Sequence, residues 1–224
     1  MPNHLSSSTL RLYFVMGSQD CKNRDPVWVL KEAIAGGITM FQFREKNSAL
    51  TLSQTVFLGK KLRDLCAKHH IPFIVNDRVD LAMVLKADGV HVGQEDLPAV
   101  QVRRLLGSDP IIGVSCKTPE EADKAMQAGA DYLGVGAMYS TRSKQNAGSP
   151  VGPSAIQRIY HMENKPLPMV GIGGIHHQNA EAVIRAGAEG IAVISAITNA
   201  PSPRHAAMRL RETAERIHAE KKAI

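Results

Sequence analysis

The residues most suited to chemistry lie in one short polar stretch that follows an apolar run. The stretch is Gln42-Phe43-Arg44-Glu45-Lys46. Side chains alternate between the two faces of a strand, so Gln42 and Arg44 share one face while Phe43 takes the other. The guanidinium fork of Arg44 beside the ammonium of Lys46 suits a phosphorylated ligand. The alternative is a solvated strand end that binds nothing.

Two carboxylates stand after neighbouring predicted strands. Asp77 follows Asn76 at the end of one apolar run, and Asp96 follows the next run along the chain. Neighbouring parallel strands lie about 4.8 Å apart, so both carboxylates can reach one cation. A pair of carboxylates suits Mg²⁺, which completes its coordination with water and substrate phosphates. The alternative is that each aspartate caps the helix that follows it.

Small residues near the end of the chain predict a phosphate site. A glycine-rich turn ends at Gly174, and Ile194-Ser195 closes the last predicted strand. Glycines let backbone N–H groups approach phosphate oxygens closely. In parallel barrels the loops after the seventh and eighth strands often form such a site. The alternative is that these glycines serve only tight turns and packing.

The longest irregular segment, 139–152, combines hydroxyls and cations. It contains Thr141-Arg142-Ser143-Lys144, which we interpret as a clamp that closes over a phosphorylated ligand, with a polar surface loop as the alternative. Ser115 ends another predicted strand. No His or Asp pattern near Ser115 in the sequence indicates a nucleophile, so we expect it to form hydrogen bonds. His91, within a strand, is expected to be a packed barrel histidine.

Helices and strands alternate along the chain, and small-residue turns such as Ala35-Gly36-Gly37 recur between them. The predicted strands are 12–16, 38–44, 72–76, 89–92, 111–115, 132–136, 169–172 and 191–195. The predicted helices are 27–35, 52–69, 79–86, 99–106, 119–128, 153–161, 179–186 and 206–220. This pattern predicts a (β/α)8 TIM barrel, whose chemistry lies at the carboxyl ends of its strands. An open doubly wound sheet is the alternative, but the glycine fingerprint after its first strand is missing.

Length and composition favour one α/β domain over residues 1–224, with residues 1–10 as a polar N-terminal extension. No apolar run is long enough to cross a membrane. The three cysteines are widely spaced, which indicates a reducing cytoplasm. The net charge of +6 comes from scattered residues, so phosphorylated small molecules are favoured over nucleic acid.

Taken together, the motifs resemble those of the thiamine phosphate synthase family over roughly residues 12–198. They are Gln42 to Lys46, Val75-Asn76-Asp77, His91 to Asp96, Gly113-Val114-Ser115, Thr141 to Lys144, Gly171 to Gly174 and Ile194-Ser195. The resemblance implies a (β/α)8 transferase of thiamine biosynthesis. It would couple 4-amino-5-hydroxymethyl-2-methylpyrimidine diphosphate to a thiazole phosphate, with Mg²⁺, and release pyrophosphate.

The resemblance also implies roles for individual residues. The pyrimidine diphosphate would be held by Gln42, Phe43, Arg44, Glu45, Lys46, Asn76, Ser115 and Lys144. The thiazole phosphate would be held by Thr141, Arg142, Ser143, Gly174, Ile194 and Ser195. Asp77 and Asp96 would bind Mg²⁺, and Arg44, Lys46, Ser115 and Lys144 would be the catalytic group. Catalysis would come mainly from stabilisation of the charge on the leaving pyrophosphate, without a protein base.

Two other functions remain open from the sequence. A thiazole tautomerase shares the barrel, but some relatives have a histidine where this chain has Lys117. A non-catalytic sensor of a phosphorylated ligand would need no metal pair. The sequence leaves open a homo-oligomer and a carboxylate on the thiazole substrate.

Overall fold

The centre of the computed structural model is a closed parallel barrel; the structure describes residues 5–46, 48–141, 143, 149–164 and 166–222. The strands follow one another around the ring in chain order. They are β1 (Leu12–Met16), β2 (Met40–Phe43), β3 (Phe73–Asn76), β4 (Gly89–Val92), β5 (Ile111–Cys116), β6 (Tyr132–Gly136), β7 (Met169–Ile172) and β8 (Gly190–Val193). The fold is therefore the predicted (β/α)8 TIM barrel.

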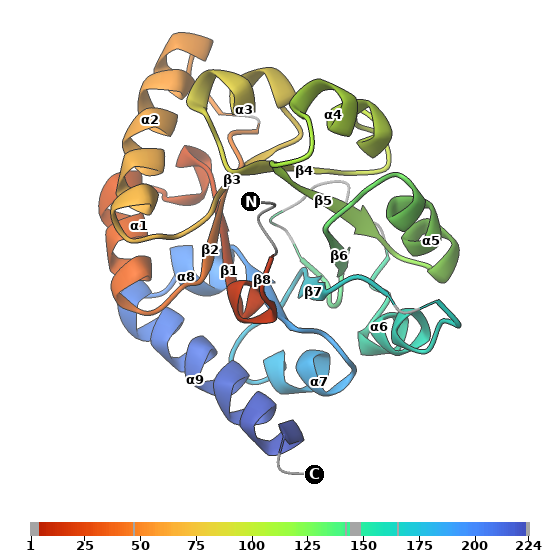
Figure 1. Cartoon of the computed structure of the whole chain (residues 1–224). Coiled ribbons are helices and arrows are strands. Elements are labelled where there is room, and N and C mark those ends of the chain that lie inside the picture. The colour runs from red at the N-terminus through yellow and green to blue at the C-terminus, as the bar shows by residue number, and fades with distance from the viewer. Residues whose placement is uncertain (1–4, 47, 142, 144–148, 165, 223–224) are drawn as a thin grey trace.

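Helices cover the outside of the ring of strands, as Figure 1 shows. They are α1 (Pro26–Ala35), α2 (Leu52–Lys68), α3 (Val79–Leu85), α4 (Ala99–Leu106), α5 (Pro119–Gln127), α6 (Pro153–Tyr160), α7 (Ala180–Arg185), α8 (Ser195–Thr198) and α9 (Pro203–Lys222). Local sequence sets several of their starts. Asp25 accepts a hydrogen bond from the Val27 N–H at α1, and Thr51 and Gln54 form a capping box at α2.

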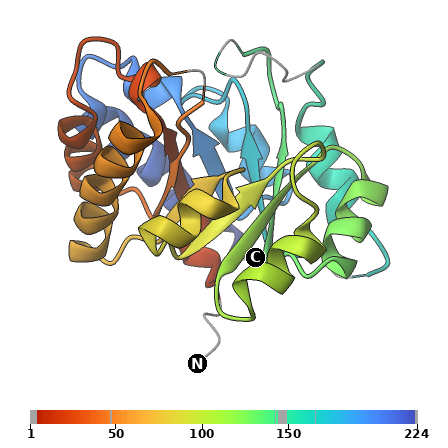
Figure 2. The same ribbon diagram turned by 90° about the horizontal axis from the view of Figure 1, so that it is seen from above.

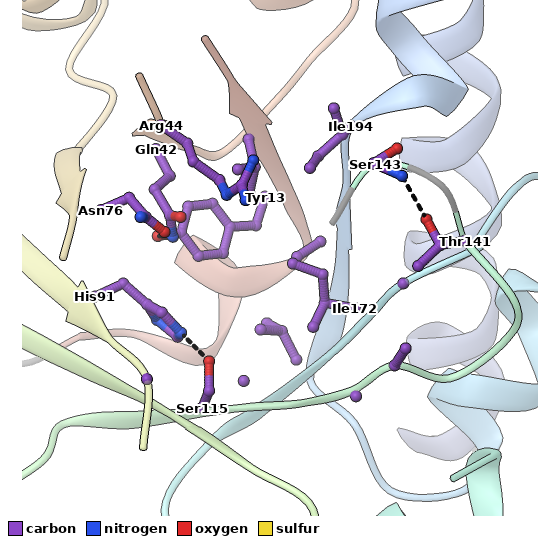
Figure 3. A pocket seen from close by; sticks show the side chains of 18 of the residues that line it. Tyr13, Gln42, Arg44, Asn76, His91, Ser115, Thr141, Ser143, Ile172 and Ile194 are labelled. Carbon is purple, nitrogen blue, oxygen red and sulfur yellow. Dashed lines mark hydrogen bonds between the residues drawn. The ribbon is translucent and has the colours of Figure 1, made fainter. Parts of the chain in front are cut away.

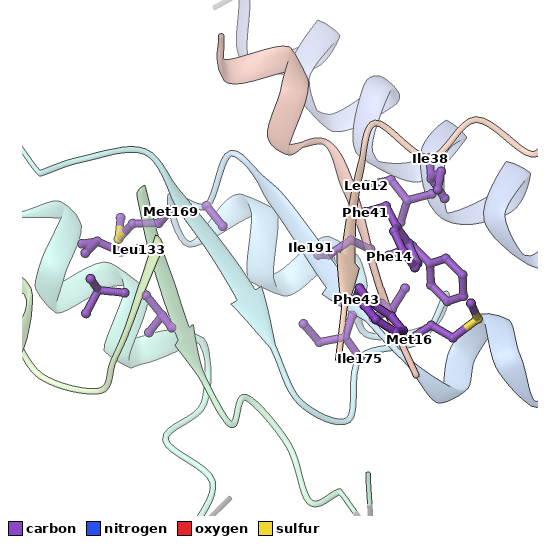
Figure 4. Close-up of a cluster of buried hydrophobic side chains, with 14 of the residues drawn as sticks. Leu12, Phe14, Met16, Ile38, Phe41, Phe43, Leu133, Met169, Ile175 and Ile191 are labelled. Carbon is purple, nitrogen blue, oxygen red and sulfur yellow. The ribbon is translucent and has the colours of Figure 1, made fainter. Parts of the chain in front are cut away.

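Alternating side chains divide the core into two layers. Inside the barrel lie Leu10, Tyr13, Val15, Met40, Ile74, Ile111, Tyr132, Val170 and Ala192. Between barrel and helices lies the larger cluster, which includes Leu12, Phe14, Met16, Phe41 and Phe43 (Figure 4). The inner layer fills the barrel at the amino-terminal ends of the strands and leaves the carboxyl-terminal end open to ligands.

Two details differ from the sequence predictions. The last strand ends at Val193 instead of Ser195, because Ile194 leaves the extended conformation (φ −115°, ψ −81°) and Ser195 begins the short helix α8. The N-terminal segment is also not a free polar extension from residue 5 onward. Ser7–Leu10 forms a 3-10 helix at the lower end of the barrel in Figure 2, and Leu10 is fully buried in the inner layer.

None of the helices in the described part of the chain is long and apolar enough to span a membrane.

Candidate active site

A cavity of about 340 Å³ opens at the carboxyl ends of the strands and gathers most of the predicted site residues. The β2–β5 side is formed by Gln42, Arg44, Lys46, Asn76, Asp96 and Ser115. The β6–β8 side is formed by Thr141, Ser143, Gly174, Ile194 and Ser195. Figure 3 shows Gln42, Arg44 and Asn76 opposite Ile194, Ser143 and Thr141. Arg142 and Lys144 lie outside the described residues, so their predicted roles stay predictions.

Two residues of the motif on β2 do not line the cavity. Phe43 is buried on the outer face of the strand, with its ring centroid 6.2 Å from that of Phe73. Its side chain therefore does not reach a ligand in the cavity, contrary to the predicted binding role. Glu45 accepts hydrogen bonds from the backbone N–H and the hydroxyl of Ser18 at 2.9 and 2.5 Å. Its carboxylate holds the loop after β1 instead of lining the cavity.

Arg44 brings a positive charge to the rim, with the Asp20 carboxyl close enough to feel it. Its guanidinium lines the cavity and forms no ion pair with any residue that the structure describes. Its backbone is fixed, because the Arg44 N–H donates to the carbonyl of Met16 at 2.9 Å and its carbonyl accepts from the Gln19 side chain at 2.9 Å. A fixed backbone and a guanidinium that faces the cavity fit an anion-binding role.

Asp77 and Asp96 form an acidic pair at the ends of β3 and β4. Burial and the neighbouring Asp77 carboxyl raise the pKa of Asp96 above its ordinary value. The backbone N–H of Gly93 donates to the Asp96 carboxylate at 2.8 Å. The Lys46 ammonium lies 2.8 Å from the Asp77 carboxylate, and the two side chains are 47% and 18% exposed. Such a half-exposed ion pair is weak, so Lys46 can leave Asp77 when another cation arrives.

The alternative role of these aspartates as helix caps is not observed within the described ranges. Helix α3 begins at Val79 and α4 at Ala99, and neither has a side-chain capping hydrogen bond. Asp77 instead adopts a left-handed backbone conformation (φ 58°), and its N–H donates to the carbonyl of His91 at 2.8 Å. This bond fixes the end of β3 against β4, which brings the two aspartates to one place.

The acidic pair fits Mg²⁺ by its chemistry. Among the described residues no group of three or more His, Cys, Asp and Glu side chains converges, so a fully protein-ligated metal is not indicated there. Mg²⁺ commonly uses one or two carboxylates and takes its remaining ligands from water and substrate phosphates. Burial is the largest cause of the raised pKa of Asp96, and a cation between the two carboxylates would offset the smaller part that comes from Asp77.

The glycine-rich turn after β7 has a structural role as well as a possible ligand role. Gly173 and Gly174 have φ of 99° and 66°, a region that favours glycine. A Cβ at Gly174 would lie 2.6 Å from the Ser140 carbonyl oxygen, and one at Gly173 would lie 2.7 Å from the Ala137 Cβ. Part of the reason for these glycines is therefore the close packing of this turn on the segment after β6.

Hydroxyl groups surround this turn. Thr141 Oγ1 accepts a hydrogen bond from the Ser143 N–H at 3.2 Å (Figure 3). A second cavity of about 480 Å³ adjoins the first, since Thr141, Ser143, Gly174 and Ser195 line both. The β6–β8 side thus offers hydroxyls and backbone groups, whereas its described residues bring no cationic side chain to the main cavity.

Sequence reasoning missed a polar network on the cavity floor. His91 and Ser115 are hydrogen-bonded, with 2.9 Å between Nε2 and Oγ, and the other ring nitrogen of His91 lies 2.9 Å from the Tyr132 hydroxyl. The sequence pattern near Ser115 contains no partner, because His91 reaches it from the neighbouring strand β4. The third member is a phenol and not a carboxylate, so the arrangement differs from a Ser-His-Asp triad.

Comparisons of the sequence and the fold with known proteins point to one family. The family model described as thiamine monophosphate synthase matches residues 12–197. A thiamine-phosphate synthase of Geobacillus kaustophilus is 50% identical over 91% of each chain, and one of Anoxybacillus flavithermus is 55% identical over 85% of this chain and 87% of its own. Among solved structures, a thiamine phosphate pyrophosphorylase from Pyrococcus furiosus is 36% identical, with a TM-score of 0.84 over 94% of this chain and 98% of its own.

Proposed function

The chain belongs to the thiamine monophosphate synthase family of thiamine biosynthesis, and we propose that it couples a pyrimidine diphosphate to a thiazole phosphate. The pyrimidine substrate would be 4-amino-5-hydroxymethyl-2-methylpyrimidine diphosphate. The products would be thiamine phosphate and pyrophosphate, and Mg²⁺ would be the cofactor. The three buried free cysteines agree with a reducing, cytoplasmic setting.

The observation that carries the proposal is the division of one cavity into two unlike sides. The β2–β5 side lines the cavity with Asp96, Arg44 and Lys46, and Asp77 joins them through its ion pair with Lys46. The β6–β8 side combines Gly174 with the hydroxyls of Thr141, Ser143 and Ser195. A diphosphate with its metal suits the first side, and a phosphate monoester suits the second. Two phosphorylated substrates in one cavity would have their reactive ends close together.

The charged residues of the β2–β5 side would each have a simple task in this reaction. Mg²⁺, held by Asp77 and Asp96, would supply positive charge to the diphosphate. Arg44 and Lys46 would bind the phosphate oxygens and stabilise the charge that grows when the C–O bond breaks. The aminopyrimidine can stabilise the resulting cation, and the thiazole nitrogen then attacks its exocyclic carbon. No protein nucleophile is needed for this reaction.

The proposed experiment is a turnover assay with purified protein. The pyrimidine diphosphate and the thiazole phosphate are mixed with the protein, with and without Mg²⁺, and thiamine phosphate and pyrophosphate are detected. We expect both products only when both substrates and Mg²⁺ are present. Metal-independent isomerisation of the thiazole phosphate, without coupling, would support a tautomerase instead. Ligand binding without any turnover would support a sensor.

A further inference from the structure

The floor of the cavity contains an unbroken chain of hydrogen bonds among five side chains on five strands, which we call the floor chain. Gln42 on β2 donates through Nε2 to the Tyr13 hydroxyl on β1 at 2.7 Å. The Tyr13 and Tyr132 hydroxyls are 2.8 Å apart across the barrel. Tyr132 on β6 reaches His91 Nδ1 at 2.9 Å, and His91 Nε2 reaches Ser115 Oγ on β5 at 2.9 Å. Gln42 and Ser115, the two ends, both line the cavity (Figure 3).

Two glycines make room for the rings of the floor chain. A Cβ at Gly113 would collide with the Tyr132 ring and with His91 Nδ1. A Cβ at Gly134 would lie 2.8 Å from His91 Cε1. Gly113 is paired with both His91 and Tyr132 in the sheet, so it lies where the two rings meet. Neither glycine has positive φ, so the backbone conformation does not require glycine at these positions. Glycine is required because the rings occupy the space that a Cβ would take.

Each hydroxyl has one proton to donate, so the series of bonds can run in one direction along the floor chain, and the Gln42 amide that donates to Tyr13 sets which direction that is. Burial raises the pKa of Tyr13 and of Tyr132, so both phenols keep their protons at neutral pH. Tyr13 accepts from Gln42, and among its hydrogen bonds to described residues only the one to the Tyr132 hydroxyl is left for its own proton, so we take Tyr13 as the donor of that pair. In this sense Tyr132 would donate to His91 Nδ1, and a neutral imidazole would have its proton on Nε2, facing Ser115.

We infer that the floor chain fixes the polarity of both of its ends, so that Gln42 presents a carbonyl oxygen and Ser115 presents a hydroxyl proton to the ligand. Tyr13, Tyr132 and His91 are then positioning residues that act through these ends. A ligand of matching chemistry is a flat heteroaromatic ring with an amino donor and a ring-nitrogen acceptor. The identification of this ring with the aminopyrimidine of the first substrate rests on the proposed function.

The direction of the chain is tested without any substrate. The protein is labelled with ¹⁵N-histidine, and the signals of His91, one of nine histidines, are assigned by their loss in His91→Gln. At neutral pH we expect the neutral ring with its proton on Nε2 and an unprotonated Nδ1. In Tyr132→Phe, which removes the donor to Nδ1, we expect the proton to redistribute toward Nδ1. A wild-type ring that is protonated on Nδ1, or on both nitrogens, would overturn the proposed direction.

The role of the chain is tested by kinetics of the full-length protein. Tyr13→Phe and Tyr132→Phe each remove one hydroxyl with little change of shape. We expect each to raise the KM for the pyrimidine diphosphate about tenfold, as for the loss of a buried hydrogen bond. The KM for the thiazole phosphate should stay unchanged. Tyr160→Phe, on the outer surface of α6, is the matched control and should change neither constant.

Thermal unfolding of each variant separates misfolding from mispositioning. Equal rises in both KM values, or no effect of Tyr132→Phe in a folded protein, would overturn the positioning role. If the wild-type protein makes no thiamine phosphate, the proposed function fails, while the ¹⁵N signals of His91 still decide whether the floor chain has this direction.

Discussion

The two sides of the cavity present different kinds of group to a ligand. The β2–β5 side uses charged side chains: an acidic pair in which burial, and then the Asp77 carboxyl, raise the pKa of Asp96, with Arg44 and Lys46 beside it. The β6–β8 side uses hydroxyls and a turn whose glycines pack against the neighbouring loop. A multiply charged diphosphate with a metal needs strong charges, whereas a monophosphate can be held by neutral donors. Under the proposed function, this difference would direct the two phosphorylated substrates to different sides of one cavity.

The largest effect is expected from the acidic pair. Asp77→Asn and Asp96→Asn should each lower kcat/KM about 100-fold, because charge stabilisation of the leaving group is lost. Affinity for the thiazole phosphate should be unchanged, as measured by calorimetry. The matched control is Asp80→Asn, since Asp80 is three residues from Asp77 but pairs with the exposed Arg78. Near-normal turnover in both Asp77 and Asp96 variants would remove the distinction between the two sides.

The next effect concerns the glycine turn. Gly174→Ala places a Cβ at φ 66° and 2.6 Å from the Ser140 carbonyl oxygen, so the turn must shift. We expect about a tenfold rise in the KM for the thiazole phosphate and no change in the KM for the pyrimidine diphosphate. Gly107→Ala has a similar positive φ with no atom within 4 Å and controls for backbone strain alone. A rise in both KM values would mean that the two sides are not separate.

A smaller effect is expected from the ion pair between Lys46 and Asp77. Lys46→Met removes the ammonium that lies 2.8 Å from the Asp77 carboxylate. Mg²⁺ should then bind the free protein up to about fivefold more tightly, within the range of an exposed ion pair. Turnover should nevertheless fall, because one cation for the diphosphate is missing. Calorimetric Mg²⁺ titration measures the first effect, with Lys60→Met on the outside of α2 as control. Weaker Mg²⁺ binding in Lys46→Met would contradict the account.

The smallest effect concerns His218, which lies outside both sides of the cavity. It tests whether a change of stability elsewhere in the barrel leaves substrate binding on the two sides unchanged. Burial and the nearby Arg11 charge lower the pKa of His218, whose Nε2 lies 3.0 Å from the Glu189 carbonyl oxygen. The folded state therefore binds fewer protons than the unfolded state just below the ordinary pKa of about 6.5. The stability from neutral His218 is present above that pH and is lost as the pH falls through the lowered pKa.

When the pH falls from 7.5 to 5.5, the free energy of unfolding should therefore decrease less in His218→Gln than in the wild type. Both KM values should be unchanged. Urea unfolding at the two pH values measures the difference. His205→Gln, an exposed change on the same helix, is the control. An identical loss of stability in wild type and His218→Gln would show that His218 does not contribute.

The prediction of the barrel from the sequence is confirmed. Charged residues at strand ends are recognisable by type, and of those predicted for the β2–β5 side Arg44 and Asp96 line the cavity, while their roles stay predictions. The sequence did not predict the floor chain. His91 meets Ser115 only through the pairing of β4 with β5, and Tyr132 meets both from a third strand. These contacts form only when the barrel closes and glycines leave space for the rings. Neither condition can be recognised in the sequence of a single segment.

Two errors have local causes. The alternation of β2 already placed Phe43 on the outer face, and its assignment to the ligand came only from its place in a motif. Leu10 was overlooked because it follows a run of polar residues, yet it is fully buried inside the barrel. The β6–β8 side was predicted less fully because backbone N–H groups are the same for every residue, and only conformation makes them a site.

The central claim, that the two sides bind separate phosphorylated groups at the same time, is tested most directly by calorimetry. Pyrophosphate with Mg²⁺ is titrated into the protein, first alone and then with saturating thiazole phosphate. The account predicts that the affinity for pyrophosphate changes less than about threefold, which is a weak coupling between sites. Loss of pyrophosphate binding in the presence of the thiazole phosphate would mean that both compete for one site, and would contradict it.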